Sequence, residues 1–180
     1  QILEFAEQTV FEIAEQETRG RKSYQNISAY TDVVMERMQE RAESGNSITG
    51  IRTGYHDLDS ITAGFQRGDL IIIAGRPAMG KSALAVNIAE TAAIKDKHSV
   101  AIFSMEMPAE QLTMRMMSSL ANIDQHKVRT GKLDGDDWIR FTSTVGILQE
   151  TKMFIDDTPA LTPAELRARC RRISREHGLD

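Results

Sequence analysis

Residues 75–82 read GRPAMGKS and place two glycines, a lysine and a serine at a fixed spacing. They follow the pattern G-x-x-x-x-G-K-[ST], which becomes informative when an apolar strand precedes it and a helix follows. The apolar run LIIIA precedes it at residues 70–74, and Leu84 and Ile88 recur at a helical spacing after it. In this context the residue types predict a loop that binds the phosphates of a nucleoside triphosphate.

The expected chemistry gives each group of this loop a task. Gly75 and Gly80 let the backbone take conformations closed to other residues, so that consecutive N–H groups converge on phosphate oxygens. Lys81 supplies a point charge to the β and γ phosphates, and the hydroxyl of Ser82 is placed to bind Mg²⁺. The alternative is a β-to-α turn that carries a surface lysine by chance. The residues expected around the nucleotide are Gly75, Arg76, Pro77, Ala78, Met79, Gly80, Lys81, Ser82 and Ala83.

A second candidate group is the carboxylate of Glu106, in the sequence FSMEMP at residues 103–108. It lies just beyond the end of a predicted strand, and in an open parallel sheet the carboxyl ends of the strands form the ligand crevice. A carboxylate there could accept a proton from the water that attacks the γ phosphate, or orient that water. From the residues alone, a loop carboxylate that merely meets solvent stays an alternative.

Two further clusters of charge lie toward the end of the chain. The sequence MFIDD predicts a short strand over residues 153–155 that is followed by two aspartates. Asp156 and Asp157 could hold a metal ion directly, or could serve a turn or a cap before Thr158. Five arginines in the last predicted helix indicate a solvated, partly ion-paired surface or, alternatively, a subunit or nucleic-acid contact. They are Arg167, Arg169, Arg171, Arg172 and Arg175.

The elements that must position these groups follow from hydrophobic periodicity. Short apolar runs that alternate with helical patterns predict an α/β fold with a parallel sheet buried on both faces. Residues 50–68 are interpreted as a glycine-rich loop, and residues 1–18 and 108–120 as helices. The strands are expected at residues 70–74, 100–103 and 153–155.

Capping residues place three more helices. Ser28 is expected to cap one helix, and Asp134, with Asp137 three residues on, is expected to open another. Thr162 and Glu165 have the spacing of a capping box at the start of the last helix.

Composition limits the possible classes. The 180 residues are 41% hydrophobic, which is enough for a core, and their formal net charge of −4 argues against a chain coated by nucleic acid. The single cysteine, Cys170, excludes an internal disulfide and fits a reducing compartment. No apolar stretch reaches the roughly 20 residues that span a bilayer, so a cytoplasmic protein without membrane contact is expected.

These stretches together resemble the DnaB family of bacterial replicative DNA helicases. The resemblance covers essentially the whole chain. The stretch FSMEMPAEQL, with its spacing to RTGKL, is much more specific to this family than the phosphate loop alone. It implies a RecA-like P-loop NTPase core with a parallel sheet, of which this chain carries the N-terminal part. It also implies a helical linker over residues 1–22, followed by the motor over residues 23–180.

The resemblance implies a ring of six subunits that couples hydrolysis of ATP, with Mg²⁺, to 5′ to 3′ movement on single-stranded DNA and to duplex unwinding. It implies catalytic roles for Glu106 and Lys81, and primase and a helicase loader as partners. The family's metal-side aspartate, arginine finger and DNA-binding loops have no counterpart in these residues, so the isolated piece is expected to be inactive.

Two other classes are weighed beside the helicase. One is an interaction module whose main task is to bind a ring neighbour, a loader or primase. The other is a different RecA-like ring ATPase, of the recombination type, that does not unwind duplexes. Small-molecule kinases also use such a loop, but nothing in the sequence indicates an acceptor site.

Overall fold

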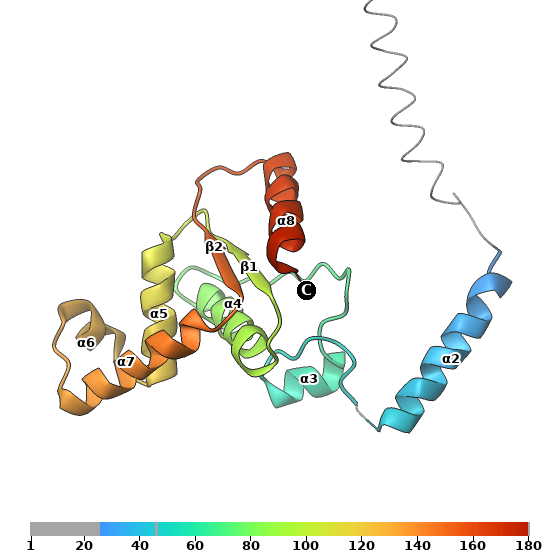
Figure 1. Ribbon diagram of the computed structural model, residues 1–180, viewed down its shortest axis with the longest axis horizontal. Coiled ribbons are helices and arrows are strands. Elements are labelled where there is room, and N and C mark those ends of the chain that lie inside the picture. Colours follow the sequence, from blue (N-terminus) through green and yellow to red (C-terminus); the bar gives the residue numbers. More distant parts are fainter. Residues whose placement is uncertain (1–25, 46, 180) are drawn as a thin grey trace, which may run out of the picture. The chain divides into compact units, whose positions relative to one another are not determined.

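The computed structural model describes residues 26–45 and 47–179, and Figure 1 shows their elements along the chain. The chain divides into two compact units, residues 1–46 and residues 47–180. The expected linker helix over residues 1–22 lies outside the described residues and stays a prediction.

The first unit contains the helix α2, Ser28–Ser44, whose described side chains are exposed. The expected cap at Ser28 was wrong, because Ile27 holds the N-cap position, and the side chain of Ile27 makes no capping hydrogen bond. Asn26 explains the difference: its Oδ1 atom accepts a hydrogen bond from the N–H of Ser28 at 3.1 Å. The helix ends at Gly45, whose φ of 61° is left-handed and suits a glycine.

The second unit opens with the segment that the sequence predicted as a glycine-rich loop. This segment contains a short helix, α3 (His56–Thr62). Asp59 of this helix is buried and accepts hydrogen bonds from the N–H and the hydroxyl of Thr53, at 2.8 and 2.7 Å. Burial raises the pKa of the Asp59 carboxyl, but the hydrogen bonds outweigh burial and hold the pKa below its usual value. A buried carboxylate therefore orders a segment that lacks the periodicity of a long helix.

Two strands form the sheet of the second unit, β1 (Val100–Phe103) and β2 (Met153–Asp156). They pair in parallel, with Ile102 opposite Ile155. Both strands lie where the apolar runs predicted them, and the parallel sheet of an α/β fold is confirmed.

The run at residues 70–74 does not form the strand that was expected of it. Leu70 is 87% exposed and Ile72 is 80% exposed, and within the described ranges the sheet consists of β1 and β2. A strand exists through backbone hydrogen bonds to a neighbouring strand, and hydrophobicity alone does not supply that neighbour. The expectation was wrong, although the phosphate loop and the helix after this run do form.

Helices gather on one face of the sheet, where the core lies. Val86 packs with Leu112 and Met116, and all three side chains are less than 5% exposed. Ile102 and Ile155 of the two strands pack against this cluster. The helices that build this layer are α4 (Lys81–Glu90), α5 (Ala109–Ala121) and α7 (Gly135–Gln149).

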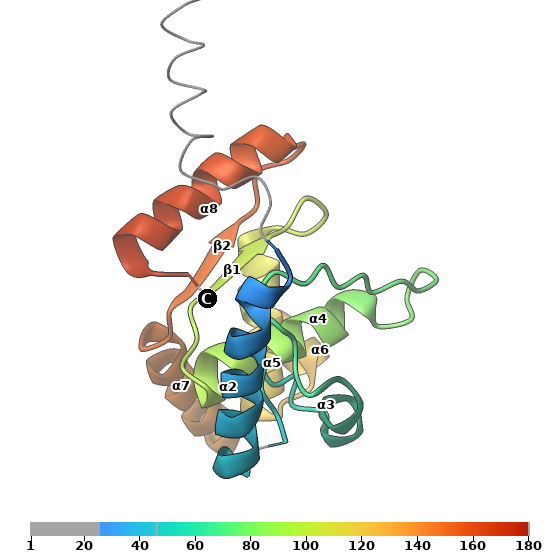
Figure 2. The same cartoon turned by 90° about the vertical axis from the view of Figure 1, so that its right-hand side faces the viewer.

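The helix α8, Pro163–His177, lies along the other face of the sheet, as Figure 2 shows. Side chains alternate along β2, so Phe154 points away from the core cluster and stacks on His177 of α8, with ring centroids 4.8 Å apart. Asp156 points to the same side and forms an ion pair with Arg169. The sheet is thus covered on both faces, as a parallel sheet requires.

The other predicted caps are confirmed. Asp134 accepts a hydrogen bond from the N–H of Asp137 at 2.7 Å, and Thr162 and Glu165 form the complete capping box. A short helix between α5 and α7, α6 (Gln125–Thr130), was not predicted, because six residues are too few for a periodic signal. None of the described helices is long and apolar enough to cross a membrane.

Candidate nucleotide-binding site

The candidate site begins where α4 begins. Gly80 occupies the N-cap position with a φ of 82°, a left-handed conformation that glycine adopts without steric cost. No side chain caps this end of the helix, so its first N–H groups, from Lys81 onward, lack partners within the helix. These groups carry the positive end of the helix dipole, which favours a bound anion.

The first glycine of the loop does not play the conformational part expected of it. Gly75 has no positive φ, and a Cβ atom built on it would lie 3.9 Å from the Cβ atoms of Met79 and Lys81, an ordinary contact distance. The left-handed residue is instead Ala78, with a φ of 62°. It sits in a turn that the N–H of Met79 closes on the carbonyl of Arg76 at 3.2 Å. The curvature of the loop therefore comes from Ala78 and the N-cap glycine.

A cavity of about 880 Å³ opens over this loop, and all nine residues expected around the nucleotide line it. Its volume falls within the roughly 300–1,000 Å³ of small-molecule sites. Glu106, in the loop after β1, lines the same cavity. The fold thus brings Lys81, Ser82 and Glu106 to one cavity, although Glu106 is 25 and 24 residues away from them in the chain.

The three polar side chains are available to a ligand. Among the described residues, no hydrogen bond or ion pair engages the side chains of Lys81, Ser82 or Glu106. Two hydrogen bonds between Ser104 and Met107 stabilise the turn that carries Glu106. The hydroxyl of Ser104 donates to the carbonyl of Met107 at 2.7 Å and accepts from the N–H of Met107 at 3.1 Å. The loop therefore presents an exposed carboxylate on an ordered backbone.

The sequence analysis missed the opposite wall of the cavity. That wall consists mainly of polar side chains from α4, α5 and the start of α6, and Arg115 adds a cation to it. Helical spacing places Ser119 on the same face as Arg115, and Asn87 on the same face as Ala83, but it does not show that these two faces meet at one cavity. The lining residues missed are Asn87, Met107, Arg115, Ser118, Ser119, Asn122, Ile123 and Gln125.

The two aspartates after β2 serve structural contacts. Asp156 pairs with Arg169 and accepts from the N–H of Thr158 at 3.1 Å, and these contacts, the arginine first, lower its pKa to about 2. Asp157 accepts from the N–H of Ala109 at 2.8 Å and so caps α5. In the described ranges no three His, Cys, Asp or Glu side chains gather as a metal site. The turn and cap interpretation is confirmed, and the other arginines of α8 are exposed: Arg167, Arg171, Arg172 and Arg175.

The parallel sheet covered on both faces and the phosphate-binding pattern at the start of α4 define a RecA-like α/β ATPase fold. Two solved structures share this fold. One, described as an ATPase domain, superimposes with a TM-score of 0.78 at 23% identity, over 86% of this chain and 54% of that chain. A DnaB-like replicative helicase, solved in a study of its interactions with primase, gives a TM-score of 0.75 at 24% identity, over 95% of this chain and 41% of that chain.

Residues 50–180 match the family described as DnaB-like helicase C terminal domain, and the chain belongs to this family. Replicative DNA helicase DnaB of Pasteurella multocida is 46% identical over 181 residues, which cover 98% of this chain and 39% of the relative. Replicative DNA helicase DnaC of Bacillus subtilis is 44% identical over 178 residues, covering 99% of this chain and 39% of the relative. The chain therefore spans about two fifths of the length of these relatives, and the resemblance seen in the sequence is confirmed.

Proposed function

We propose that this chain is the phosphate-binding part of the motor of a replicative DNA helicase, which hydrolyses ATP with Mg²⁺ to move along single-stranded DNA and unwind duplexes. One observation carries the proposal: the free amides at the start of α4, Lys81, Ser82 and Glu106 line a single cavity. Family membership supports the identity of the motor.

Each group has a distinct task in the proposed reaction. The N–H groups of residues 80–83 and the ammonium of Lys81 hold the β and γ phosphates and offset the charge that develops as the γ phosphoryl group leaves. The hydroxyl of Ser82 would hold Mg²⁺, which would offset negative charge on the phosphates. The carboxylate of Glu106 orients the attacking water and accepts its proton.

The remaining parts of the proposal rest on the relatives, which are named as replicative DNA helicases. They are assembly of six copies into a ring, single-stranded DNA in its channel, and primase and a helicase loader as partners. A linker over residues 1–22, a motor from residue 23 and a cytoplasmic location belong to the same proposal.

Replacement of the phosphate-loop lysine tests the function. In the longest natural chain that contains residues 1–180, Lys81→Ala should reduce ATP hydrolysis and DNA unwinding at least 100-fold, because the point charge on the phosphates is lost. Lys132→Ala is the matched control, since Lys132 is exposed and lies outside the cavity lining. Hydrolysis by Lys81→Ala within a few fold of the wild type would refute the site.

A further inference from the structure

Glu90 is a buried carboxyl group to which the proposed reaction gives no task. It lies in the last turn of α4 and is 8% exposed. The hydroxyl of Ser119, near the end of α5, donates a hydrogen bond to its Oε2 atom at 3.2 Å. Its Oε1 atom is buried and finds no hydrogen-bond partner among the residues that the structure describes. Such an atom is costly in a fold, so its retention calls for a physical reason.

The position of Glu90 connects it to the candidate nucleotide site. Ser119, its partner, lines the large cavity, and so does Asn87, one helical turn before Glu90. On its other side Glu90 lines a smaller cavity of about 280 Å³, to which Asn87 also contributes. The side-chain amide of Asn87 donates to the hydroxyl of Tyr55 at 3.2 Å. Polar contacts thus connect the end of α4 to the wall of the nucleotide cavity.

The Glu90 to Ser119 hydrogen bond is a polar contact between two helices that otherwise meet through apolar side chains. Val86 packs on Leu112 and Met116 nearer the sheet. The end of α5 lies beyond this cluster, and Ser119 is ten residues past the start of the helix, about 15 Å along its axis. The hydrogen bond thus adds a directional polar contact one helical turn beyond the apolar contact of Val86 with Met116.

We propose that Glu90 is a positioning residue of the nucleotide site, which acts through Ser119 to hold the end of α5 against α4 and so sets the cavity wall to which Arg115 and Ser119 contribute. This inference rests on the proposed function, because it concerns the same site. It gives the two carboxyl groups separate roles: Glu106 acts on the attacking water, and Glu90 acts on the shape of the cavity.

The pKa of the Glu90 carboxyl is consistent with its buried position. Burial raises the pKa of its carboxyl to about 7, and the hydrogen bond from Ser119 opposes burial only in part. Besides Glu90, the titratable or charged side chains that line the two cavities are Tyr55, Arg76, Lys81, Lys95, Glu106 and Arg115. Ionisation places a charge on a carboxyl group whose second oxygen has no partner, which favours its movement toward water. The contact should therefore loosen as the pH rises through 7.

The proposal predicts a change in the Michaelis constant rather than in turnover. Ser119 lies at the opposite end of α5 from the loop that holds Glu106, so a loosened wall should alter nucleotide binding more than the step in which Glu106 acts. Contacts made equally in the ground and transition states affect KM and leave kcat unchanged. A side chain that only stabilised the fold would lower the amount of active protein, and hence the apparent kcat, without changing KM.

The test compares four variants of the longest natural chain that contains residues 1–180, by steady-state ATP hydrolysis between pH 6.5 and 8.5. Glu90→Ala and Ser119→Ala should each raise KM for ATP about 5- to 20-fold with kcat within about 2-fold, and the double variant should be no worse than either single variant. Glu90→Gln keeps an acceptor for Ser119 and cannot ionise. Its KM should stay near the wild-type value at pH 6.5 and fall below it at pH 8.5.

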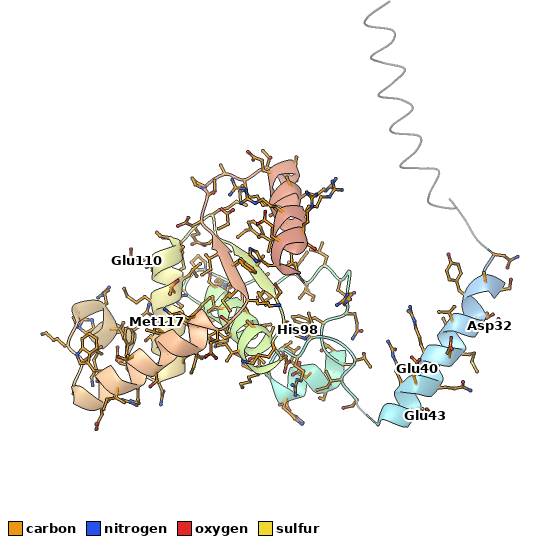
Figure 3. All side chains as sticks on the ribbon, viewed as in Figure 1. Asp32, Glu40, Glu43, His98, Glu110 and Met117 are labelled. Atoms are coloured by element: carbon orange, nitrogen blue, oxygen red, sulfur yellow. The ribbon has the colours of Figure 1, made fainter. Side chains whose placement is uncertain are left out.

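The control is Glu110→Gln. Glu110, labelled in Figure 3, is an exposed carboxylate in the first turn of α5, the helix that carries Ser119. It should reproduce the wild-type KM at every pH. Unchanged KM in Glu90→Ala and Ser119→Ala, or identical pH profiles of Glu90→Gln and the wild type, would overturn the positioning role. Absence of hydrolysis in the wild type itself, or undiminished hydrolysis in Lys81→Ala, would instead refute the proposed function.

Discussion

Two glutamates of this chain have opposite surroundings, and the surroundings decide their chemistry. Glu106 is exposed at the mouth of a cavity that also holds a lysine and a serine. Glu90 is buried between two helices and keeps its proton up to about neutral pH. A base that accepts a proton from water must be reachable by that water, so the exposed Glu106 fits that role and the buried Glu90 does not.

Glu106→Gln tests the assignment of the base. The amide keeps the shape of the side chain but loses its basicity, so ATP binding should be retained while turnover falls about 10²- to 10⁴-fold. Binding is measured with a fluorescent ATP analogue and turnover by phosphate release. Turnover within a few fold of the wild type would exclude Glu106 as the base.

The raised pKa of Glu90 also predicts how the free energy of unfolding depends on pH. Its pKa in the folded chain is about 7, against an ordinary value of 4.5, so the folded state binds the proton more tightly than the unfolded state. The free energy of unfolding must then fall as the pH rises from about 4.5 to 7. Glutamine cannot ionise, so Glu90→Gln should not show this fall. Measured by urea unfolding, its free energy of unfolding relative to the wild type should rise by about 1–3 kcal/mol between pH 5 and pH 8. An equal pH dependence in both proteins would contradict the raised pKa.

At the scale of elements, the start of helix α5 is capped by a residue that lies far from it in the sequence. Helix α5 follows Pro108, which holds its N-cap position without a side-chain cap. The acceptor comes from Asp157, 48 residues later, whose carboxylate reaches the N–H of Ala109. The segment after β2 therefore secures the start of the helix whose far end lines the nucleotide cavity.

Asp157→Ala measures this remote cap. Loss of the acceptor should lower the free energy of unfolding by about 1 kcal/mol, the usual cost of an N-cap deletion. Asp157→Asn retains an oxygen acceptor and should cost less. Glu150→Ala, which removes an exposed carboxylate after α7, is the control and should change stability by less than about 0.5 kcal/mol. Equal stability of Asp157→Ala and the control would show that the hydrogen bond contributes nothing.

The sequence predicted a helix or strand correctly where the residues that determine it lie close together in the chain. The capping box at Thr162 and the apolar runs of β1 and β2 are of this kind, because each needs residues close in sequence. The run at residues 70–74 shows the limit, since pairing partners decide whether an apolar run becomes a strand. Helix α3 was missed for a related reason: its order depends on the hydrogen bonds that Asp59 accepts from residues before the helix.

For the molecule as a whole, the sequence predicted the loop residues that line the cavity but not the residues of its far wall. The pattern around Lys81 predicted the nine loop residues that line the cavity, because backbone geometry ties that pattern to one function. Arg115 and Ser119 were missed, since their relevance arises only when α5 folds over α4. Glu90 could not be found either, because a glutamate in a helix gives no sign of burial until the helix on its other side is known.

Family membership extends the account to the longer relatives. The chain covers 39% of the replicative helicases from Pasteurella multocida and Bacillus subtilis, so the proposals on ring assembly and unwinding concern the whole length of such proteins. The structure of residues 47–179 nevertheless contains the complete phosphate loop, its helix and the proposed base in one compact unit. Nucleotide binding is therefore the property on which all the other proposals depend.

A crystal structure of this chain with Mg²⁺ and a non-hydrolysable ATP analogue tests that property most directly. The β and γ phosphates should lie within about 3 Å of the N–H groups of residues 80–83 and of the Lys81 ammonium, with Mg²⁺ on the hydroxyl of Ser82. An empty cavity at saturating analogue, or phosphates bound elsewhere on the chain, would contradict the account.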